Sequence, residues 1–167
     1  YCPTSEKFFE RNKKYNDTKP FFVLVSRLEE HKSLEFVFKT FSLINEELVV
    51  IGTGKLIEKY KKLYPKIIFK GFIDDDYMIQ LLTEAKASII PTKNEYSLPI
   101  IESFARGTPV VAIKCAASDE LVLMNARKNN IKLGVIFNDA TVKSLKTAIE
   151  TINVDITNYI IDEIIKY

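Results

Sequence analysis

Short, uninterrupted apolar runs alternate along the chain with stretches in which apolar residues recur every three or four positions. The continuous runs are typical of strands buried on both faces of a parallel sheet, and the spaced residues are typical of amphipathic helices. Such alternation with short connections predicts an α/β fold, a doubly wound parallel sheet of about six strands with helices on both faces. The predicted strands are residues 21–26, 48–51, 67–69, 87–90, 109–113 and 134–137. The predicted helices are residues 33–43, 55–64, 74–84, 97–106, 118–128 and 141–152.

Composition divides the chain into three segments. Residues 1–20 are polar and contain prolines and asparagines, as expected of a linker remnant. Residues 21–152 hold the whole strand–helix series, and residues 153–167 form a predicted helical tail outside it. The start has neither an initiator methionine nor the apolar core of a signal peptide, so we expect another domain to precede it.

Charge and cysteine content exclude several classes of function. Lys plus Arg is 24 and Asp plus Glu is 22, which leaves no basic surplus for nucleic acid. No apolar run approaches the roughly 20 residues that cross a bilayer. Cys2 and Cys115 are no disulfide framework or zinc motif, and His31 is the only histidine. We therefore expect a cytoplasmic protein without a metal centre.

In an open parallel sheet, ligands bind beside the loops that follow the carboxyl ends of the strands. The first such loop, Ser26–Ser33, contains no glycine, which counts against the G-x-G-x-x-G of a nicotinamide or flavin enzyme. It offers Arg27 at the strand end and Lys32 at the start of the next helix, where the helix dipole also favours an anion. Two interpretations stay open: a phosphate site, or two solvated surface cations.

The second and third loops resemble binding motifs only superficially. Gly52-Thr53-Gly54-Lys55 lacks the spacing and the final Ser or Thr of a P-loop. The acids from Asp74 to Asp76 are interpreted as helix caps and first-turn acids rather than as metal ligands.

The fourth loop, Pro91–Glu102, places a strand end, a polar segment and a helix N-terminus in series. Ser97 is a candidate N-cap, and the amides of Leu98 and Ile100 have no partner within the helix. Glu102 lies one turn further on, where a carboxylate can accept hydrogen bonds from two vicinal sugar hydroxyls. The alternative for Glu102 is a first-turn acid that the helix dipole stabilises.

Taken in order, these pieces resemble the C-terminal domain of retaining glycosyltransferases of the GT-B fold, family 4. The resemblance covers roughly residues 21–152 and implies a Rossmann-like domain that is one half of a GT-B fold. Its most specific part runs from Leu98 to Ala112. The matching pieces are Ser26-Arg27 with Lys32, Val50 to Gly54, Phe69 to Ile73, Pro91-Thr92, and Glu95 to Ala112.

The resemblance implies that the domain binds a nucleotide-diphosphate sugar without a metal or another cofactor. The implied donor-binding positions are Arg27 and Lys32 for the diphosphate, Gly52 and Gly54 beside the nucleotide, the backbone of Phe72 and Ile73 for the base, Glu102 for the ribose, and the amides of Ser97, Leu98 and Ile100 for the phosphates and sugar.

Several positions depart from the family pattern. The family has an acid eight positions before its second glutamate, where this chain has Asn94, whereas Glu95 is seven positions before Glu102. Either Asn94 or Glu95 is therefore the candidate catalytic, sugar-contacting residue. Ser33 and Ser97 stand where glycine is common, and Ala116-Ala117 replaces a usual glycine pair.

The implied activity of the full-length protein is transfer of a hexose, with retention, to a glycan, lipid or protein. The isolated domain is expected to be inactive without the missing N-terminal GT-B domain. Association of the full-length protein with the inner face of a membrane, through that missing domain, stays open. A degenerate, non-catalytic donor domain is one alternative. A nucleotide-sugar epimerase or hydrolase is another, for which only His31 offers itself.

Overall fold

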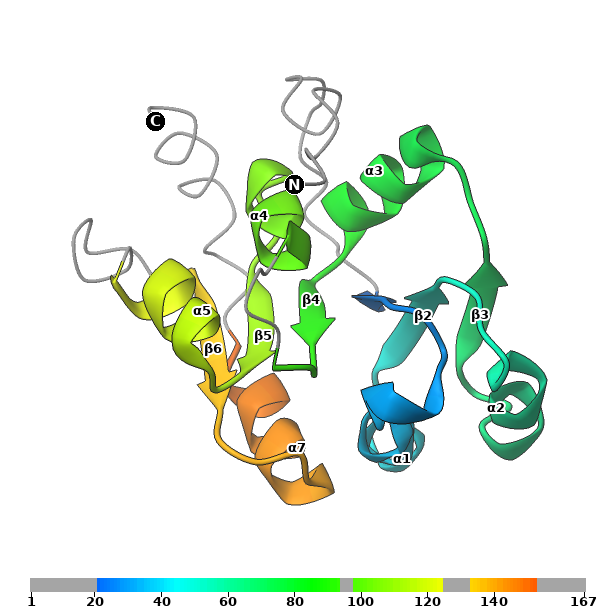
Figure 1. Cartoon of the computed structure of the whole chain (residues 1–167). Coiled ribbons are helices and arrows are strands. Elements are labelled where there is room, and N and C mark those ends of the chain that lie inside the picture. The colour runs from blue at the N-terminus through cyan, green and yellow to red at the C-terminus, as the bar shows by residue number, and fades with distance from the viewer. Residues whose placement is uncertain (1–20, 94–97, 125–132, 153–167) are drawn as a thin grey trace.

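The fold is a six-stranded parallel sheet in the order β3-β2-β1-β4-β5-β6, seen in a computed structural model that describes residues 21–93, 98–124 and 133–152 (Figure 1). This confirms the predicted fold class and all six predicted strands. β4 and β5 are fully buried, and β1 and β2 are buried at all but one residue, as their continuous apolar runs require, whereas β3 at the edge of the sheet is only partly buried. The strands are β1 (Phe21–Val25), β2 (Glu47–Ile51), β3 (Ile68–Gly71), β4 (Ala87–Ile90), β5 (Val110–Ile113) and β6 (Gly134–Phe137).

Helices cover both faces of the sheet. One face carries α1, α2 and α7, and the other carries α3, α4 and the α5–η3 segment (Figure 1). None of the helices in the described ranges is long and apolar enough to cross a membrane. The helices are the short 3-10 turn η2 (Glu30–Lys32), α1 (Glu35–Leu43), α2 (Ile57–Leu63), α3 (Asp75–Glu84), α4 (Leu98–Ala105), α5 (Ala116–Ser118), the π-helix η3 (Asp119–Met124) and α7 (Val142–Thr151).

An aromatic cluster fastens α1 and α2 to the sheet. Phe38 of α1 lies with its ring centroid 4.8 Å from that of Tyr60 and 5.5 Å from that of Tyr64, and it also meets Phe69 of β3 at 5.5 Å. The pairs of Phe38 with Tyr60 and Phe69 are edge-to-face, and such pairs add about 0.5–1.5 kcal/mol each beyond the area that they bury. The two helices are therefore held as one unit against the β2–β3 side of the sheet.

The structure departs from the sequence prediction mainly after β5. In place of one α-helix beginning at Ser118, α5 begins at Ala116 and passes into a π-helix from Asp119 to Met124. The turn starts early because the Cys115 N–H donates to Ser118 Oγ at 2.9 Å, while that hydroxyl donates to the carbonyl of Ile113 at 2.8 Å. The rest of the predicted helix, the linker remnant 1–20 and the tail 153–167 lie outside the described residues.

The strand order contains one reversal, and it lies between β1 and β4. The chain moves outward from β1 to β2 and β3, then crosses back through α3 to place β4 on the other side of β1. In open α/β sheets the loops diverge at such a switch point and leave a crevice for a ligand beyond the carboxyl ends of the strands. The loops that border it here follow β1 and β4.

Candidate functional site

The loop after β1 is held in place by its own backbone. The amide of Ser26 donates to the carbonyl of Ile51 at 3.0 Å, and the amide of Leu28 donates to that of Thr53 at 2.9 Å. Leu28 is fully buried, and its carbonyl accepts from Leu56 at 3.1 Å. The pairing of β1 with β2 thus continues beyond the strands, and the stretch that presents Arg27 is rigidly located.

Arg27 and Lys32 both lie in this loop region, as predicted. The side chain of Arg27 is exposed, and Lys32 ends the 3-10 turn η2 with a partly buried side chain. The next residue, Ser33, is in the left-handed conformation with φ 49°. Only glycine adopts that conformation without a steric penalty. The conformation at this position therefore suits the glycine that the family resemblance implies there better than it suits Ser33.

Gly52 and Gly54 allow the second loop to lie directly against the first. A Cβ atom on Gly52, whose φ is 130°, would stand 2.1 Å from the carbonyl oxygen of Ser26. One on Gly54 would stand 2.3 Å from the carbonyl oxygen of Leu28. The contact is backbone against backbone, which cannot give way as a side chain could. The sequence predicted proximity to a nucleotide for these glycines, and the structure adds that they brace the first loop.

The third loop, which follows β3, lies at the same edge of the sheet. Gly52 donates from its amide to the carbonyl of Gly71 at 2.8 Å, which links the second and third loops. Phe72 is 83% exposed, whereas Ile73 packs partly into the core beneath α3. Asp74 is the N-cap of α3, because its carboxylate accepts from the amide of Tyr77 at 2.9 Å. This confirms the interpretation of Asp74 as a helix cap.

Helix α4 follows β4, on the other side of the switch point. It begins at Leu98, with Pro99 in its first turn, where a missing N–H does no harm. Ile100 is fully buried and Phe104 nearly so, against β4 and β5. Because the side chain of Ile100 belongs to the core, only its backbone amide could meet a ligand.

Glu102 is partly buried on α4. Burial raises the pKa of its carboxyl above the ordinary value of 4.5, and the negative charge of Asp75 at the start of α3 raises it further. The structure thus places Glu102, which was predicted to bind the ribose, near Asp75 in the first turn of α3. A partly buried carboxylate is suited to accept hydrogen bonds from neutral hydroxyls.

The far end of α4 is fastened to α3. The helix ends in a Schellman motif: Gly107 has φ 67°, its amide donates to Phe104, and the amide of Thr108 donates to Ser103. The Thr108 hydroxyl then donates to the carbonyl of Leu82 on α3. This confirms Gly107 as the predicted helix stop.

Arg106 adds a second tie that the sequence did not single out. Its guanidinium Nε donates to Thr83 Oγ1 on α3 at 3.2 Å, and its burial lowers the pKa of the guanidinium. An arginine at the C-terminal end of a helix is usually a solvated charge, so only the packing of α4 against α3 shows this role.

Some predicted site residues fall outside the described part of the chain. These are the candidate sugar-contacting residues Asn94 and Glu95 and the candidate cap Ser97. Among the described residues, no three His, Cys, Asp or Glu side chains lie together as a metal site would require.

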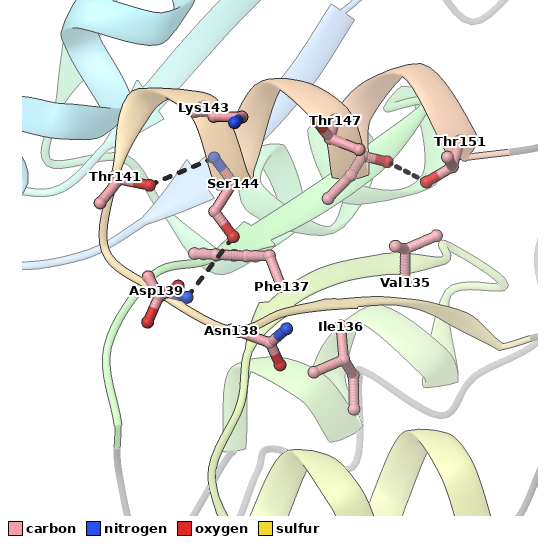
Figure 2. A pocket seen from close by; sticks show the side chains of 11 residues that line it. Val135, Ile136, Phe137, Asn138, Asp139, Thr141, Lys143, Ser144, Thr147 and Thr151 are labelled. Carbon is pink, nitrogen blue, oxygen red and sulfur yellow. Dashed lines mark hydrogen bonds between the residues drawn. The ribbon is translucent and has the colours of Figure 1, made fainter.

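A cavity of about 470 Å³ lies away from the switch point, between β6 and α7 (Figure 2). Three of its polar side chains, Thr141, Ser144 and Thr151, make local hydrogen bonds. Thr141 caps α7 by accepting from the amide of Ser144 at 3.2 Å, and the Ser144 hydroxyl accepts from the amide of Asp139 at 3.4 Å (Figure 2). Thr151 donates to the carbonyl of Ala148 at 2.9 Å. Among the residues that the structure describes, none of the predicted site residues lines this cavity.

Comparison with known proteins identifies the family. A family model described as glycosyl transferases group 1 matches residues 19–155, and the chain belongs to this family. An uncharacterized glycosyltransferase of Methanocaldococcus jannaschii is 26% identical over 125 residues, which are 68% of this chain and 32% of that protein. The chain thus spans about a third of the length of this curated relative.

Solved structures share the fold. The catalytic domain of the Helicobacter pylori cholesterol-α-glucosyltransferase superposes with a TM-score of 0.68 at 17% identity, over 89% of this chain and 99% of that one. The lipopolysaccharide outer core galactosyltransferase WaaB gives 0.66 at 17%, over 87% and 45%. Anabaena HepE, solved in complex with UDP and glucose, gives 0.62 at 19%, over 86% and 42%. The chain is therefore a Rossmann-like domain of the GT-B glycosyltransferase fold.

Proposed function

We propose that this chain is the donor-binding domain of a glycosyltransferase and that it holds a nucleotide-diphosphate sugar at the β1–β4 switch point. The observation that supports the proposal is the strand order: the loop of Arg27 and Lys32 follows β1, the helix of Glu102 follows β4, and β1 and β4 are the neighbouring strands at the switch point. Two cations suit a diphosphate, and a carboxylate suits the vicinal hydroxyls of a ribose.

The proposed chemistry follows from the charges. Arg27 and Lys32 would bind the diphosphate and stabilise the negative charge that grows on it as the bond to the sugar breaks. The amides of Leu98 and Ile100, at the start of α4, would add hydrogen bonds to the phosphates. The exposed Phe72 and the half-buried Ile73 lie in the loop that would hold the base. Asn94 or Glu95 would contact the sugar.

The whole protein would transfer a hexose with retention to a glycan, lipid or protein. An N-terminal GT-B domain would supply the acceptor site, so the present chain should bind a donor without completing transfer. UDP is bound in the HepE structure, which makes UDP-sugars the first donors to test. We propose that binding needs no metal, and addition of a chelator during titration tests this point directly.

Calorimetric titration of the 167-residue chain with UDP, GDP and their sugar conjugates tests the proposal. A charge-assisted hydrogen bond contributes about 1.5–3 kcal/mol, so Arg27→Ala and Lys32→Ala should each weaken nucleoside diphosphate binding roughly tenfold or more. Lys114→Ala is the matched control, because Lys114 is an exposed lysine at the carboxyl end of β5 on the same sheet edge. Unchanged affinity in both loop variants would refute the proposed clamp.

The same ligands separate the proposed enzyme from a degenerate binding domain. Changes at Asn94 or Glu95 should weaken binding of the nucleotide sugar while leaving the plain nucleoside diphosphate unaffected. Measured turnover by a protein that also carries the N-terminal domain would distinguish catalysis from binding alone.

A further inference from the structure

The sheet has two edge strands, and their sequences differ in how they resist further pairing. β3 carries the exposed Lys70, and its register with β2 shifts between Val50 and Ile51. A charged side chain and an irregular ladder both keep an edge strand from pairing with another chain. β6 has neither, because Gly134–Phe137 is uncharged, contains no proline and pairs with β5 in unbroken register. The sequence of β6 thus offers no barrier to a further strand.

The hydrogen-bonding groups on the outer side of β6 belong to Gly134 and Ile136. The amide of Lys114 donates to the carbonyl of Phe137 at 2.8 Å, so Phe137 and the alternate residue Val135 direct their backbone groups towards β5. In a strand, the N–H and C=O of one residue point to the same side, and those of the next residue point to the opposite side. Those of Gly134 and Ile136 therefore point away from the sheet. Among the described residues, no strand pairs with β6 on that side.

The cavity of about 470 Å³ in Figure 2 lies along this edge. Its first wall is β6, where Val135 packs on the core beneath α7 and Ile136 packs on the core of the opposite face. Both side chains are only half buried. Its second wall is a stripe of small, uncharged side chains at helical spacing on α7, called the α7 stripe below. The α7 stripe consists of Ser144, Thr147, Ala148 and Thr151.

We propose that a second copy of this chain pairs with this edge, so that the two β6 strands meet antiparallel about a twofold axis and the two sheets become continuous. In the register that sets Gly134 opposite Ile136 of the partner subunit, the outward N–H and C=O groups of both residues are hydrogen-bonded. The same register sets Val135 opposite Val135 of the partner subunit, at the axis itself. Each α7 stripe then lies beside the other on one face of the joined sheet.

The chemistry of the edge suits a copy of itself. A twofold axis sets the centre of the contact against its own counterpart, so a charged centre would repel itself. The centre here is Val135, and β-branched residues are favourable when they face each other across two strands. On the other face of the sheet, Ile136 would lie beside Gly134 of the partner subunit, which has no side chain to exclude it. An acidic or basic peptide would find no counter-charge on β6 or on the α7 stripe.

This edge is separate from the proposed donor site. β6 ends the sheet, and β5 lies between it and the switch-point strand β4. Pairing at the lateral edge would not cover the loops that follow β1 and β4. Association of two copies and binding of a nucleotide can therefore succeed or fail independently.

Analytical ultracentrifugation of the 167-residue chain from about 5 to about 500 μM tests the inference, because small interfaces dissociate in this range. The mass should rise from that of one chain, 19.2 kDa, towards twice that value. Thr147→Lys adds a charge to the α7 stripe, and Ile136→Lys adds one to the strand. Each variant should associate at least about tenfold more weakly, because the axis brings each new lysine towards its counterpart. Ile68→Lys is the matched control on the β3 edge and should associate as the parent chain does.

Cysteine cross-linking tests the register. Residues directly opposite each other in an antiparallel pair have Cα atoms about 4.5–5.5 Å apart, which a disulfide can span. In a chain that also carries Cys2→Ser and Cys115→Ser, Val135→Cys should form covalent dimers under mild oxidation. Thr53→Cys, at an exposed position in the second loop, should not.

The opposite results would overturn the proposal. A mass of one chain at every concentration would mean that another part of the chain or a different partner covers the edge. Full association of Thr147→Lys, or an equal loss in Ile68→Lys, would place the contact elsewhere. Dimers that Val135→Cys fails to cross-link would refute the pairing of β6 with itself. Thr147 and Ile68 are exposed, so thermal melting should show that both of these lysine variants remain folded.

Discussion

The two sides of the switch point are built in different ways. On the β1 side, the Ser26–Ser33 loop is held by backbone hydrogen bonds and by two glycines that admit no Cβ. On the β4 side, α4 is held by buried side chains and by polar ties at its C-terminal end. The first arrangement is intolerant of added atoms, and the second is intolerant of lost ones. Substitutions that add atoms should therefore lower stability most on the β1 side, and substitutions that remove atoms should lower it most on the β4 side.

The largest effect is expected on the α4 side, from Phe104→Ala. Removing this nearly buried ring leaves a cavity against β4 and β5, and such truncations cost about 3–5 kcal/mol of folding free energy. Phe72→Ala is the matched control, because Phe72 is 83% exposed and its truncation should change stability by less than about 0.5 kcal/mol. Chemical denaturation of both variants measures the difference, and equal losses would contradict the account of α4.

On the β1 side, Gly52→Ala should destabilise the fold by about 3 kcal/mol, through contact with the Ser26 carbonyl and through backbone strain. Gly71→Ala provides the control. Gly71 also has a positive φ, 72°, but no atom lies within 4 Å of a Cβ placed there. Its cost should be only the left-handed penalty, about 1–2 kcal/mol. Melting temperatures of the two variants separate crowding from strain, and the account fails if they are equal.

The features that could be predicted from the sequence are those that a few neighbouring residues specify. All six strands were predicted because each contains a short continuous apolar run, such as Leu48 to Ile51, which a parallel sheet can bury. The π-helix after Ser118 could not be predicted, because a few residues cannot distinguish its wider period from that of an α-helix. Gly107 was predicted as a helix stop because its chemistry is local.

The candidate site was predictable only in part. Arg27, Lys32 and Glu102 stand out because each follows a predicted strand. Three features could not be anticipated, since each depends on contacts between segments distant in sequence: the bracing of the first loop by Gly54, the tie from Arg106 to α3, and the influence of Asp75 on Glu102. The roles of Asn94 and Glu95 stay predictions.

A third test addresses function and stability together on the α4 side. Glu102→Gln should weaken nucleoside diphosphate binding roughly tenfold, because a charged acceptor is lost. The same change should raise the melting temperature at neutral pH, since burial and Asp75 both disfavour the folded carboxylate. The pKa is raised on folding, so the carboxylate destabilises the fold above that pKa, and this penalty disappears as pH falls below the unfolded value of 4.5.

Melting curves of Glu102→Gln and the parent chain should therefore diverge at pH 7 and converge below about pH 4. Asp75→Asn should lower the pKa of the Glu102 carboxyl only in part, because the charge of Asp75 is the lesser cause of the raised pKa. If Glu102→Gln leaves nucleotide affinity intact, Glu102 is only a first-turn acid of α4.

The smallest effect is expected at Ser33 on the β1 side. Ser33→Gly removes the left-handed penalty of a residue at φ 49°, while glycine gains entropy in the unfolded chain. The net gain should be about 0.5 kcal/mol. Ser33→Ala keeps the Cβ and should give no gain. Urea denaturation midpoints check both variants, and a loss of stability in Ser33→Gly would show that the serine hydroxyl matters more than the backbone.

The ties between α3 and α4 have a mechanical consequence. Arg106 and Thr108 fasten the two helices where both end, whereas towards the carboxyl edge of the sheet Glu102 and Asp75 set like charges against each other. The two helices are therefore joined at their C-terminal ends and repel each other electrostatically near Glu102. A ligand hydroxyl bound to Glu102 would act at the end that lacks these ties, so the spacing between Glu102 and Asp75 would change before the packing of the helices on the sheet does.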